Sequence, residues 1–525
     1  MSPSHRTAIV TVLCAALVSV TGTASTDARS PPERAARRSA PMHAVSTRLT
    51  FNGASRTIPA GFLGLSVEVS EITRYELAGR AVDHVFGLLR SPGDGRLLLR
   101  VGGTSADHAW WYTAGKPAPA GVFTIGRPWV SGLAALVARD DLRVVLGLNL
   151  AVHSPALEVA FASAVQRALP RSTLAGLEIG NEPDLYEREQ WLQRQRLATT
   201  ERALPRRWTQ AYSPGDYQAD YESYAWAVRA RLGPISLEAP DTTTPALAWL
   251  RAATGLRTLD PEIIAVHSYP LSTCWPKDSA EYPTVARLLA EHATVGLANS
   301  VRRAAQFAHE DHMTFRVTEL NSVSCGGNTG VADSFATALW APDALFELLS
   351  AGVDGVNVHL HPDSLNAPFQ LTADGIRPLP ELYGLALFAQ LIGSHARLLD
   401  TNLHAPRGLH LKAWATRHGS VTAVLLIDKS DRDAEVSIPA AGRGAPPAVL
   451  RLLQAPSIRS VGEVVYAGRS IGSDGRWQGR ATTSAARVGT HGEYHVRVPA
   501  MSAVTLTIRA GVRRGRRAIL GTSRN

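Results

Sequence analysis

Short apolar runs alternate with longer amphipathic stretches between about residues 60 and 395. Each run has the length of a buried strand, and the stretches between them are long enough for a crossover helix. In residues 330–352, for example, Ala, Leu, Trp and Phe recur at helical spacing. The runs are 64–70, 96–103, 143–150, 176–182, 236–241, 263–270, 314–320 and 355–361. Eight strand-then-helix units predict an α/β fold, a (β/α)8 TIM barrel over residues 60–395.

The pattern changes at about residue 396. Short β-rich segments follow one another, separated by Gly, Pro, Asp and Ser. This spacing predicts a C-terminal antiparallel β-sandwich domain over residues 396–510. Residues 45–59 also have the pattern of strands and precede the barrel, so we expect them to pair with the sandwich.

The two ends of the chain differ from the rest. Residues 1–24 contain a positive charge, an uncharged apolar stretch and then small residues, which predicts an export signal peptide. Cys14 within that stretch leaves a lipoprotein as the alternative. Residues 25–44 and 511–525 lack periodicity and predict a disordered linker and a disordered basic tail. We therefore expect a secreted, extracellular protein with no stable membrane insertion.

The net charge of +9 is concentrated at these ends. Residues 1–44 hold five arginines and two acids, and residues 511–525 hold five arginines and no acid, so the ends account for eight of the nine charges. The part expected to fold is nearly neutral, which argues against a nucleic-acid partner. The sequence leaves the oligomeric state open.

Most of the eight runs end in a polar or charged residue. In a parallel barrel the carboxyl ends of the strands form the active-site face, so these residues are expected to meet there. They are Glu68, Glu182, Asp241, Tyr269, Glu319 and His361.

Two of these residues, Glu182 and Glu319, have the chemistry that glycoside hydrolysis requires. One carboxyl group protonates the leaving oxygen, and the other attacks the anomeric carbon or activates water. Glu182 closes run four as Asn181-Glu182-Pro183, and Pro183 ends the strand because it cannot donate to a ladder. Asn181 is placed to bind a sugar hydroxyl. Glu319 closes run seven, so both glutamates are expected to face the same barrel mouth.

Two cysteines remain after signal removal. Cys274 follows run six and Cys325 follows run seven, so both loops lie on the predicted active face. An even pair in an exported chain predicts a disulfide between Cys274 and Cys325, with two free thiols as the alternative.

An Asn-Glu acid/base on strand four with a Glu nucleophile on strand seven is typical of the large clan of retaining (β/α)8 glycosidases. More narrowly, the chain resembles glycoside hydrolase family 79, the β-glucuronidase and heparanase family. With the sandwich, the resemblance covers residues 45 to about 510. Its segments are Leu99–Thr104, Glu178–Asp184, Ala239–Asp241, His267–Tyr269, Glu319–Gly327 and Pro378–Tyr383.

The resemblance implies double displacement with Glu182 as the acid/base and Glu319 as the nucleophile. It also implies that Tyr269 contacts the nucleophile and the substrate and helps to set the ionisation of Glu319. Arg100 is implied either to support the nucleophile or to form a structural ion pair in the barrel. No cofactor and no metal is expected for this reaction.

The resemblance also implies sugar contacts. Asn181 is expected beside the scissile bond, and Glu68 lies where the family has an acidic sugar contact. Ser324, however, stands where family enzymes that grip a glucuronate carboxylate tend to have a tyrosine. The backbone amides of Gly326 and Gly327 can still form an anion-binding nest.

A histidine is a second replacement for that missing carboxylate contact. Protonated His361 is our candidate, and a metal pair formed by His359 and His361 is the alternative. The predicted substrate is a carbohydrate, a β-glucuronide or 4-O-methyl-glucuronide. The alternatives are a β-glycoside of a neutral sugar or disaccharide, and a barrel that binds carbohydrate without hydrolysing it.

Overall fold

The computed structural model describes residues 44–112, 118, 122–186 and 212–509. The predicted signal peptide, the linker apart from residue 44, and the basic tail lie outside the described residues. No helix in the described ranges is long and apolar enough to cross a membrane.

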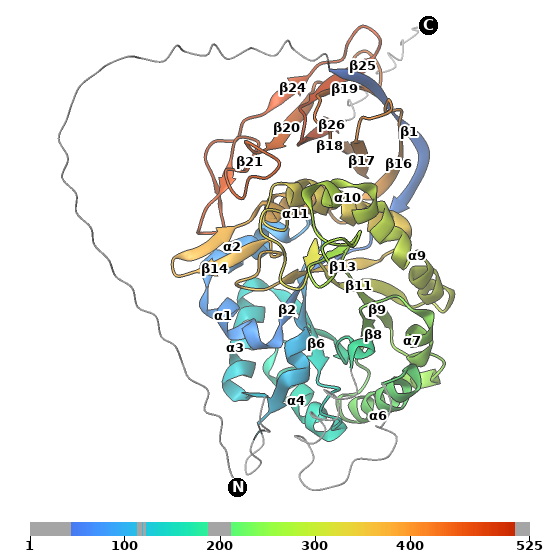
Figure 1. The fold of residues 1–525 in the computed structure, drawn as a ribbon, viewed down its shortest axis with the longest axis vertical. Coiled ribbons are helices and arrows are strands. Elements are labelled where there is room, and N and C mark those ends of the chain that lie inside the picture. The colour runs from blue at the N-terminus through green and yellow to red at the C-terminus, as the bar shows by residue number, and fades with distance from the viewer. Residues whose placement is uncertain (1–43, 113–117, 119–121, 187–211, 510–525) are drawn as a thin grey trace, which may run out of the picture. The chain divides into compact units, whose positions relative to one another are not determined.

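Eight parallel strands close into a barrel (Figure 1). Every strand overlaps one of the eight predicted runs, so the predicted barrel is confirmed. Around the ring, neighbouring strands follow chain order. The strands are β2 (Leu63–Glu68), β3 (Leu97–Gly102), β6 (Leu142–Leu148), β7 (Leu174–Ile179), β8 (Leu237–Thr242), β9 (Ile263–Ser268), β11 (Thr314–Leu320) and β13 (Gly355–Leu360).

Helices connect the strands. In α6, Ser213 and Asp216 form a reciprocal capping box and Pro214 occupies the first turn. The α-helices of the described residues are α1 (Ile72–Leu77), α2 (Arg80–Leu89), α3 (Arg127–Asp140), α4 (Pro155–Ala168), α6 (Pro214–Leu232), α7 (Leu247–Ala252), α8 (Val285–Leu289), α9 (Val295–Glu310), α10 (Ala336–Ala351) and α11 (Pro380–Leu391).

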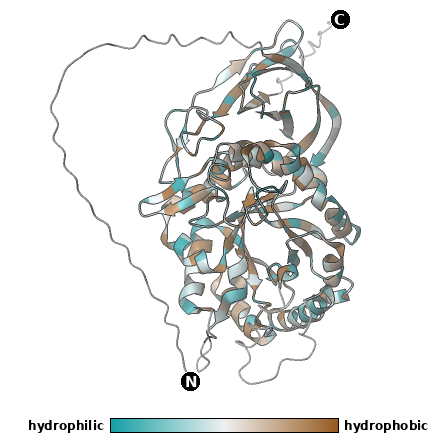
Figure 2. Ribbon diagram, in the orientation of Figure 1, coloured by the Kyte–Doolittle hydropathy of each residue, from teal (hydrophilic) through white to brown (hydrophobic). Residues whose placement is uncertain are grey.

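The helices differ in how much of their surface is buried. Figure 2 shows α10 and α11 as largely hydrophobic and α6 as largely hydrophilic. Nearly every residue of α10 is buried, whereas α6 buries one face. A helix that is apolar on most sides must be covered on most sides, and α10 is covered by the C-terminal domain.

The C-terminal domain is built on one continuous sheet that folds over an apolar core. The core includes Leu49, Leu426, Val436, Val496 and Leu506. The strand order is β21, β20, β26, β18, β17, β16, β1, β19, β25, with β24 beside β20. The strands are β1 (Val45–Thr57), β16 (Arg397–Leu403), β17 (Leu411–His418), β18 (Val421–Asp428), β19 (Ala434–Pro439), β20 (Ala448–Gln454), β21 (Val465–Tyr466), β24 (Ser484–Ala486), β25 (Glu493–Val498) and β26 (Ser502–Arg509).

Strand β1 lies between β16 and β19 in this sheet. Its second half pairs antiparallel with β16, and its first residues, Val45 to Arg48, pair parallel with Ala434 to Ser437 of β19. The predicted antiparallel C-terminal domain is confirmed, and the pairing of β1 with β19 is the one parallel pairing in this sheet among the described residues. The segment comes from before the barrel, so no hairpin turn fixes its direction relative to β19.

The sandwich contacts the barrel through α10, the helix between β11 and β13. Trp414 stacks on Phe346 with ring centroids 5.3 Å apart, and its indole N–H donates to Asp343 Oδ1 at 2.8 Å. Lys429 Nζ lies 2.6 Å from Asp343 Oδ2, and both side chains are buried. This contact supports α10 behind the strand that carries Glu319.

Candidate active site

Glu182 and Glu319 meet at the carboxyl end of the barrel. One ligand atom from each of Glu182, His267 and Glu319 lies within 4.8 Å of the other two, so a carboxylate oxygen of one glutamate lies within 4.8 Å of one of the other. Their side chains are 20% and 12% exposed. Two partly exposed carboxyl groups therefore lie close together at the end of the barrel.

Glu182 lies in a turn beyond β7. The sequence predicted a strand through Glu182, but β7 ends at Ile179 because Gly180 takes a left-handed conformation (φ 89°) against Leu150. Glu182 is itself left-handed (φ 47°, ψ 51°), and its N–H donates to the Asp241 carbonyl at 2.9 Å. A non-glycine residue in this region costs about 1–3 kcal/mol and often marks a functional site.

Glu319 is held by two strong hydrogen bonds. Arg100 Nη1 donates to Oε2 at 2.8 Å, and the Tyr269 hydroxyl donates to Oε1 at 2.6 Å. Burial by itself raises the pKa of Glu319, but the charges of His359, His267 and Arg100 and the Tyr269 hydrogen bond outweigh it and hold the pKa well below its usual value. Glu319 is therefore kept ionised.

Arg100 is fully buried beneath the two glutamates. Its Nε and Nη2 donate to Glu178 at 2.5 and 2.6 Å, and Nη2 also donates to Asn181 Oδ1 at 2.8 Å. Nη1 donates to Ser66 Oγ at 3.0 Å in addition to Glu319. One guanidinium thus pairs both with the buried Glu178 and with the candidate nucleophile, and the support of Glu319 by Arg100 stays a prediction.

His267 links Glu182 to the floor of the site. Its Nδ1 lies 2.9 Å from Glu182 Oε1 and 4.0 Å from Glu319 Oε2, and its Nε2 lies 3.8 Å from Asp241 Oδ1. Burial lowers the pKa of His267, but Glu319 and Glu182 raise it, and the net pKa is above its ordinary value. The sequence argument did not assign His267 a role. Its one signal was its position two residues before Tyr269 on the same strand, hence on the same face.

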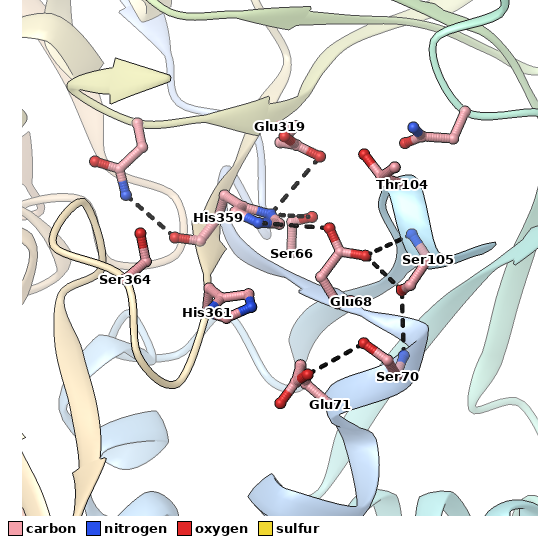
Figure 3. A network of polar contacts seen from close by, with 12 residues as sticks. Ser66, Glu68, Ser70, Glu71, Thr104, Ser105, Glu319, His359, His361 and Ser364 are labelled. Atoms are coloured by element: carbon pink, nitrogen blue, oxygen red, sulfur yellow. Dashed lines mark hydrogen bonds and ion pairs between the residues drawn. The ribbon is translucent and has the colours of Figure 1, made fainter. Parts of the chain in front are cut away.

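Glu68 lies across His359 from Glu319 (Figure 3). His359 Nδ1 is 3.6 Å from Glu319 Oε2, and its Nε2 is 3.9 Å from Glu68 Oε1. Glu68 Oε2 accepts the Ser105 N–H at 2.8 Å and also its hydroxyl. Gly103 (φ 75°) is required here, since a Cβ would lie 2.4 Å from the Glu68 carboxylate. Glu68 is thus fixed at the β2 edge of the mouth.

His361 and Asp363 lie in the loop after β13, and the alternative of a metal pair formed by His359 and His361 stays a prediction. Both carboxylate oxygens of Asp363 accept hydrogen bonds from Arg74, at 2.7 and 2.9 Å. The Asp363 N–H donates to His361 Nδ1 at 3.3 Å. The ion pair fixes the loop after β13, and Figure 3 shows His361 on the same side of the mouth as Glu68.

Ser324, Gly326 and Gly327 belong to the loop after β11. Ser324 lies on the short strand β12 (Val323–Ser324), parallel to β10 (Leu271–Ser272). The Gly326 carbonyl accepts the Ser364 hydroxyl at 3.1 Å, and a Cβ on Gly327 would lie 2.9 Å from the Asn366 nitrogen. These glycines, both left-handed, let the loop pack against the loop after β13. Their role as an anion nest stays a prediction.

The predicted disulfide between Cys274 and Cys325 is confirmed, with the two Cα atoms 6.0 Å apart. It joins the loop that follows Tyr269 to the loop that follows Glu319. Tyr269 and Glu319 hydrogen-bond to each other, and the loops that follow them are therefore also linked by a covalent bond.

Two groups of side chains in the described residues have the spacing of a cation site. They are Glu182, His267 and Glu319, and, below them, Glu178, Glu238 and Asp241. Arg100 forms ion pairs with Glu178 and with Glu319, and burial raises the pKa of Glu238 to about 7. The expectation of a reaction without a metal stays a prediction.

The fold is shared with solved glycoside hydrolases. A 4-O-α-L-rhamnosyl-β-D-glucuronidase from Fusarium oxysporum 12S, solved as a Rha-GlcA complex, superposes with a TM-score of 0.70 at 17% identity, over 88% of this chain and 100% of that one. A GH51 arabinofuranosidase from Xanthomonas axonopodis pv. citri gives 0.59 at 15% identity, over 89% and 100%. A GH30 endoxylanase from Clostridium papyrosolvens C71 gives 0.51 at 11%, over 88% and 100%.

No protein-family model and no curated protein matches the chain. At the identities above, the structural similarity shows a common fold, a (β/α)8 barrel with a β-rich C-terminal domain, and the function must be argued from the site. Membership of family 79 stays a prediction.

Proposed function

We propose that this protein is a secreted retaining β-glycoside hydrolase of the β-glucuronidase type. The observation that carries the proposal is the unequal treatment of two neighbouring carboxyl groups. Glu319 is kept ionised by Arg100 and Tyr269, and an oxygen of Glu182 lies within 4.8 Å of it. Retaining enzymes have carboxyl groups about 5–5.5 Å apart, whereas inverting enzymes leave a wider gap for water.

In the first step, a carboxylate oxygen of Glu319 attacks the anomeric carbon as the glycosidic C–O bond breaks. The leaving oxygen takes the proton of Glu182. His267 holds Glu182 through Oε1, so we assign the transferred proton to Oε2. The sugar is then an ester of Glu319.

In the second step, Glu182 is ionised and takes a proton from water. The water oxygen attacks the anomeric carbon, and the ester bond to Glu319 breaks. Arg100 and Tyr269 bind the carboxylate that departs, so the contacts that keep Glu319 ionised at rest also stabilise it as a leaving group.

For the sugar, we propose a β-glucuronide or a substituted β-glucuronide. Histidines line the mouth: His359 lies beside Glu68, and His361 lies on the same side (Figure 3). A protonated histidine can pair with a uronate carboxylate. The Asn181 oxygen is engaged by Arg100, so its NH2 group is the donor left for a sugar hydroxyl. The rhamnosyl-glucuronidase among the structural neighbours supports a uronide.

A disulfide on the active face supports the exported location, because disulfides persist in oxidising compartments. A β-glycosidase for a neutral sugar or disaccharide remains the alternative activity, favoured by Ser324 at the position of the family tyrosine.

The test is a screen of the purified protein against the 4-nitrophenyl β-D-glucuronide, glucoside, galactoside and xyloside, with Glu319→Gln as the matched inactive variant. We expect turnover of the glucuronide, and NMR should show the β-anomer of the free sugar first. If the α-anomer of the free sugar appears first, the enzyme inverts the anomeric configuration and the proposed retaining mechanism is wrong. Sugar binding without turnover of any glycoside would favour the non-catalytic alternative.

A further inference from the structure

A cavity of about 900 Å³ lies beside the proposed catalytic site. It opens between η1 (Val69–Glu71), the parallel pair β4 (Ala109–Trp111) and β5 (Phe123–Ile125), and the start of α3. Its size is that of a ligand pocket. The side chains used below line it: Ser70, Thr73, Trp111, Tyr112, Phe123 and Arg127. We call it the aromatic groove.

Hydrogen bonds through Ser105 link Ser70, in the wall of the aromatic groove, to Glu68 of the catalytic site. The Ser70 N–H donates to Ser105 Oγ at 3.2 Å, and Ser105 donates its N–H to Glu68 at 2.8 Å. Figure 3 shows Glu68, Ser105 and Ser70 in succession, leading away from Glu319. One side chain, that of Ser105, therefore stands between Glu68 and Ser70 of the groove wall.

The barrel order tells which part of the substrate reaches the groove. Glu182 protonates the leaving oxygen in the proposed mechanism, so the leaving group lies near Glu182, over β7 and β8. Strand β8 belongs to this side because the Asp241 carbonyl accepts the Glu182 N–H. In the closed ring β2 lies opposite β8. The groove follows β2 and β3, so it faces the far, non-reducing side of the sugar that Glu319 attacks.

The lining of the groove suits a sugar ring. Trp111, Tyr112 and Phe123 offer aromatic surface for the C–H face of a pyranose, and Tyr112 is 58% exposed. Trp111 is already held in place against Phe161, with ring centroids 5.6 Å apart. Hydroxyls and Arg127, the one cation among the described residues of the lining, supply hydrogen bonds. Aromatic faces together with hydroxyls suit a neutral sugar better than a polyanionic glycan.

We infer that the aromatic groove binds a second, neutral pyranose attached to the non-reducing side of the catalytic sugar, so that the protein releases a disaccharide. The inference rests on the proposed function and names its substrate class. The same two-step chemistry applies, and the glycosyl ester on Glu319 is then a disaccharide ester.

The test compares capped and uncapped aryl glycosides. The first pair is 4-nitrophenyl 4-O-α-L-rhamnosyl-β-D-glucuronide and 4-nitrophenyl β-D-glucuronide, and the second is 4-nitrophenyl β-cellobioside and β-D-glucoside. We expect kcat/KM at least about tenfold higher for the capped member of one pair. Tyr112→Ala should remove most of that preference and leave the uncapped substrate unchanged. The matched control is Trp226→Ala, an aromatic on α6 that is 68% exposed.

Equal rates on both members of each pair, or an equal loss on both in Tyr112→Ala, would overturn the inference and leave the proposed function intact. If none of the four substrates is turned over, the proposed function fails instead. The groove is then judged by calorimetry with free rhamnosyl-glucuronic acid and cellobiose on wild type: binding that Tyr112→Ala abolishes supports it, and no binding overturns it.

Discussion

The two sides of the barrel mouth treat their glutamates differently. On the β11 side, Glu319 accepts hydrogen bonds from Arg100 and Tyr269 and faces His359. On the β7 side, the one side chain bonded to Glu182 among the described residues is His267. Both glutamates are partly buried, so the cations and donors make the difference between them. One carboxyl group is held as an anion by these donors and cations, and the other has a single histidine as its side-chain partner among the described residues.

The backbone differs in the same sense. Glu319 lies within a strand paired on both edges, whereas Glu182 lies in a left-handed turn after its strand has ended. A nucleophile must hold its position while a bond forms, and a strand gives that rigidity. The predictions below test whether the two sides are unequal in function as they are in structure.

The largest effect is expected from removing either carboxyl group. Glu319→Gln should lower kcat on the order of 10⁴-fold or more on every glycoside, because no ester can form. Glu182→Gln should lower kcat about 10²–10⁴-fold on methyl glycosides, which need a proton, and much less on formation of the ester from 4-nitrophenyl glycosides. The measurement is steady-state and burst kinetics on both leaving groups. The same leaving-group dependence in both variants would contradict the assignment of roles.

Arg100→Lys should lower kcat/KM about 100-fold. A lysine keeps the charge but cannot form the fork that contacts Glu178, Asn181 and Glu319 together, and each lost charge-assisted hydrogen bond costs about 1.5–3 kcal/mol. The matched control is Arg316→Lys, a buried barrel arginine that donates to Asn357. Both variants should melt earlier than wild type. An equal loss of kcat/KM in the two would mean that Arg100 acts through stability alone.

Tyr269→Phe should lower kcat/KM about 10- to 50-fold by removing one hydrogen bond to Glu319. That bond lowers the pKa of Glu319, so its loss raises the pKa, and the acid limb of the kcat/KM profile should move to higher pH. Tyr221→Phe, which loses a hydrogen bond to the Leu259 carbonyl, should change neither the rate nor the limb. A fall in rate with an unmoved acid limb would mean that Tyr269 acts on the substrate instead.

His267→Gln should lower kcat/KM about tenfold, mainly on methyl glycosides. The glutamine keeps a donor near Glu182 but cannot carry the positive charge that an imidazole can place beside that carboxyl group, so proton transfer from Glu182 suffers most. Methyl and 4-nitrophenyl glycosides of one sugar separate this from a role at Glu319, which lies 4.0 Å away. An equal loss of kcat/KM on both leaving groups would mean that His267 acts on Glu319 rather than on Glu182.

The fold could be predicted because barrel strands are buried on both faces. Each apolar run was short enough to be distinguished from a helix, and the helix expected in 330–352 is α10, Ala336–Ala351. The pairs β4–β5 and β10–β12 were missed, since strands of two or three residues have no periodicity. The aromatic groove depends on β4 and β5 and could not be foreseen.

The candidate site could be predicted only as far as strand ends allow. Glu182 and Glu319 were expected from the ends of their apolar runs, and the roles of Tyr269 and Arg100 came from the family resemblance. The contacts of His267 and His359 with these glutamates were not foreseen. Which side chains touch across the mouth depends on local register, and β11 shifts register between Val317 and Glu319. Such an irregularity changes the direction in which the following side chains point, and the pattern of apolar residues does not predict that change.

The smallest effect on the rate is expected from the disulfide. It links the loops beyond Tyr269 and Glu319, both on the more rigid side of the mouth, and closes a loop of 51 residues. Chain-entropy arguments give about 4 kcal/mol for such a link. The double variant Cys274→Ser with Cys325→Ser should therefore melt several degrees lower yet keep kcat/KM at 25 °C within about threefold, because the strands already fix both side chains. Wild type reduced with dithiothreitol should behave as the double variant does. A loss at 25 °C as large as that in Tyr269→Phe would show instead that the strands alone do not hold the Glu319 side, and that its rigidity depends on the covalent link between the two loops.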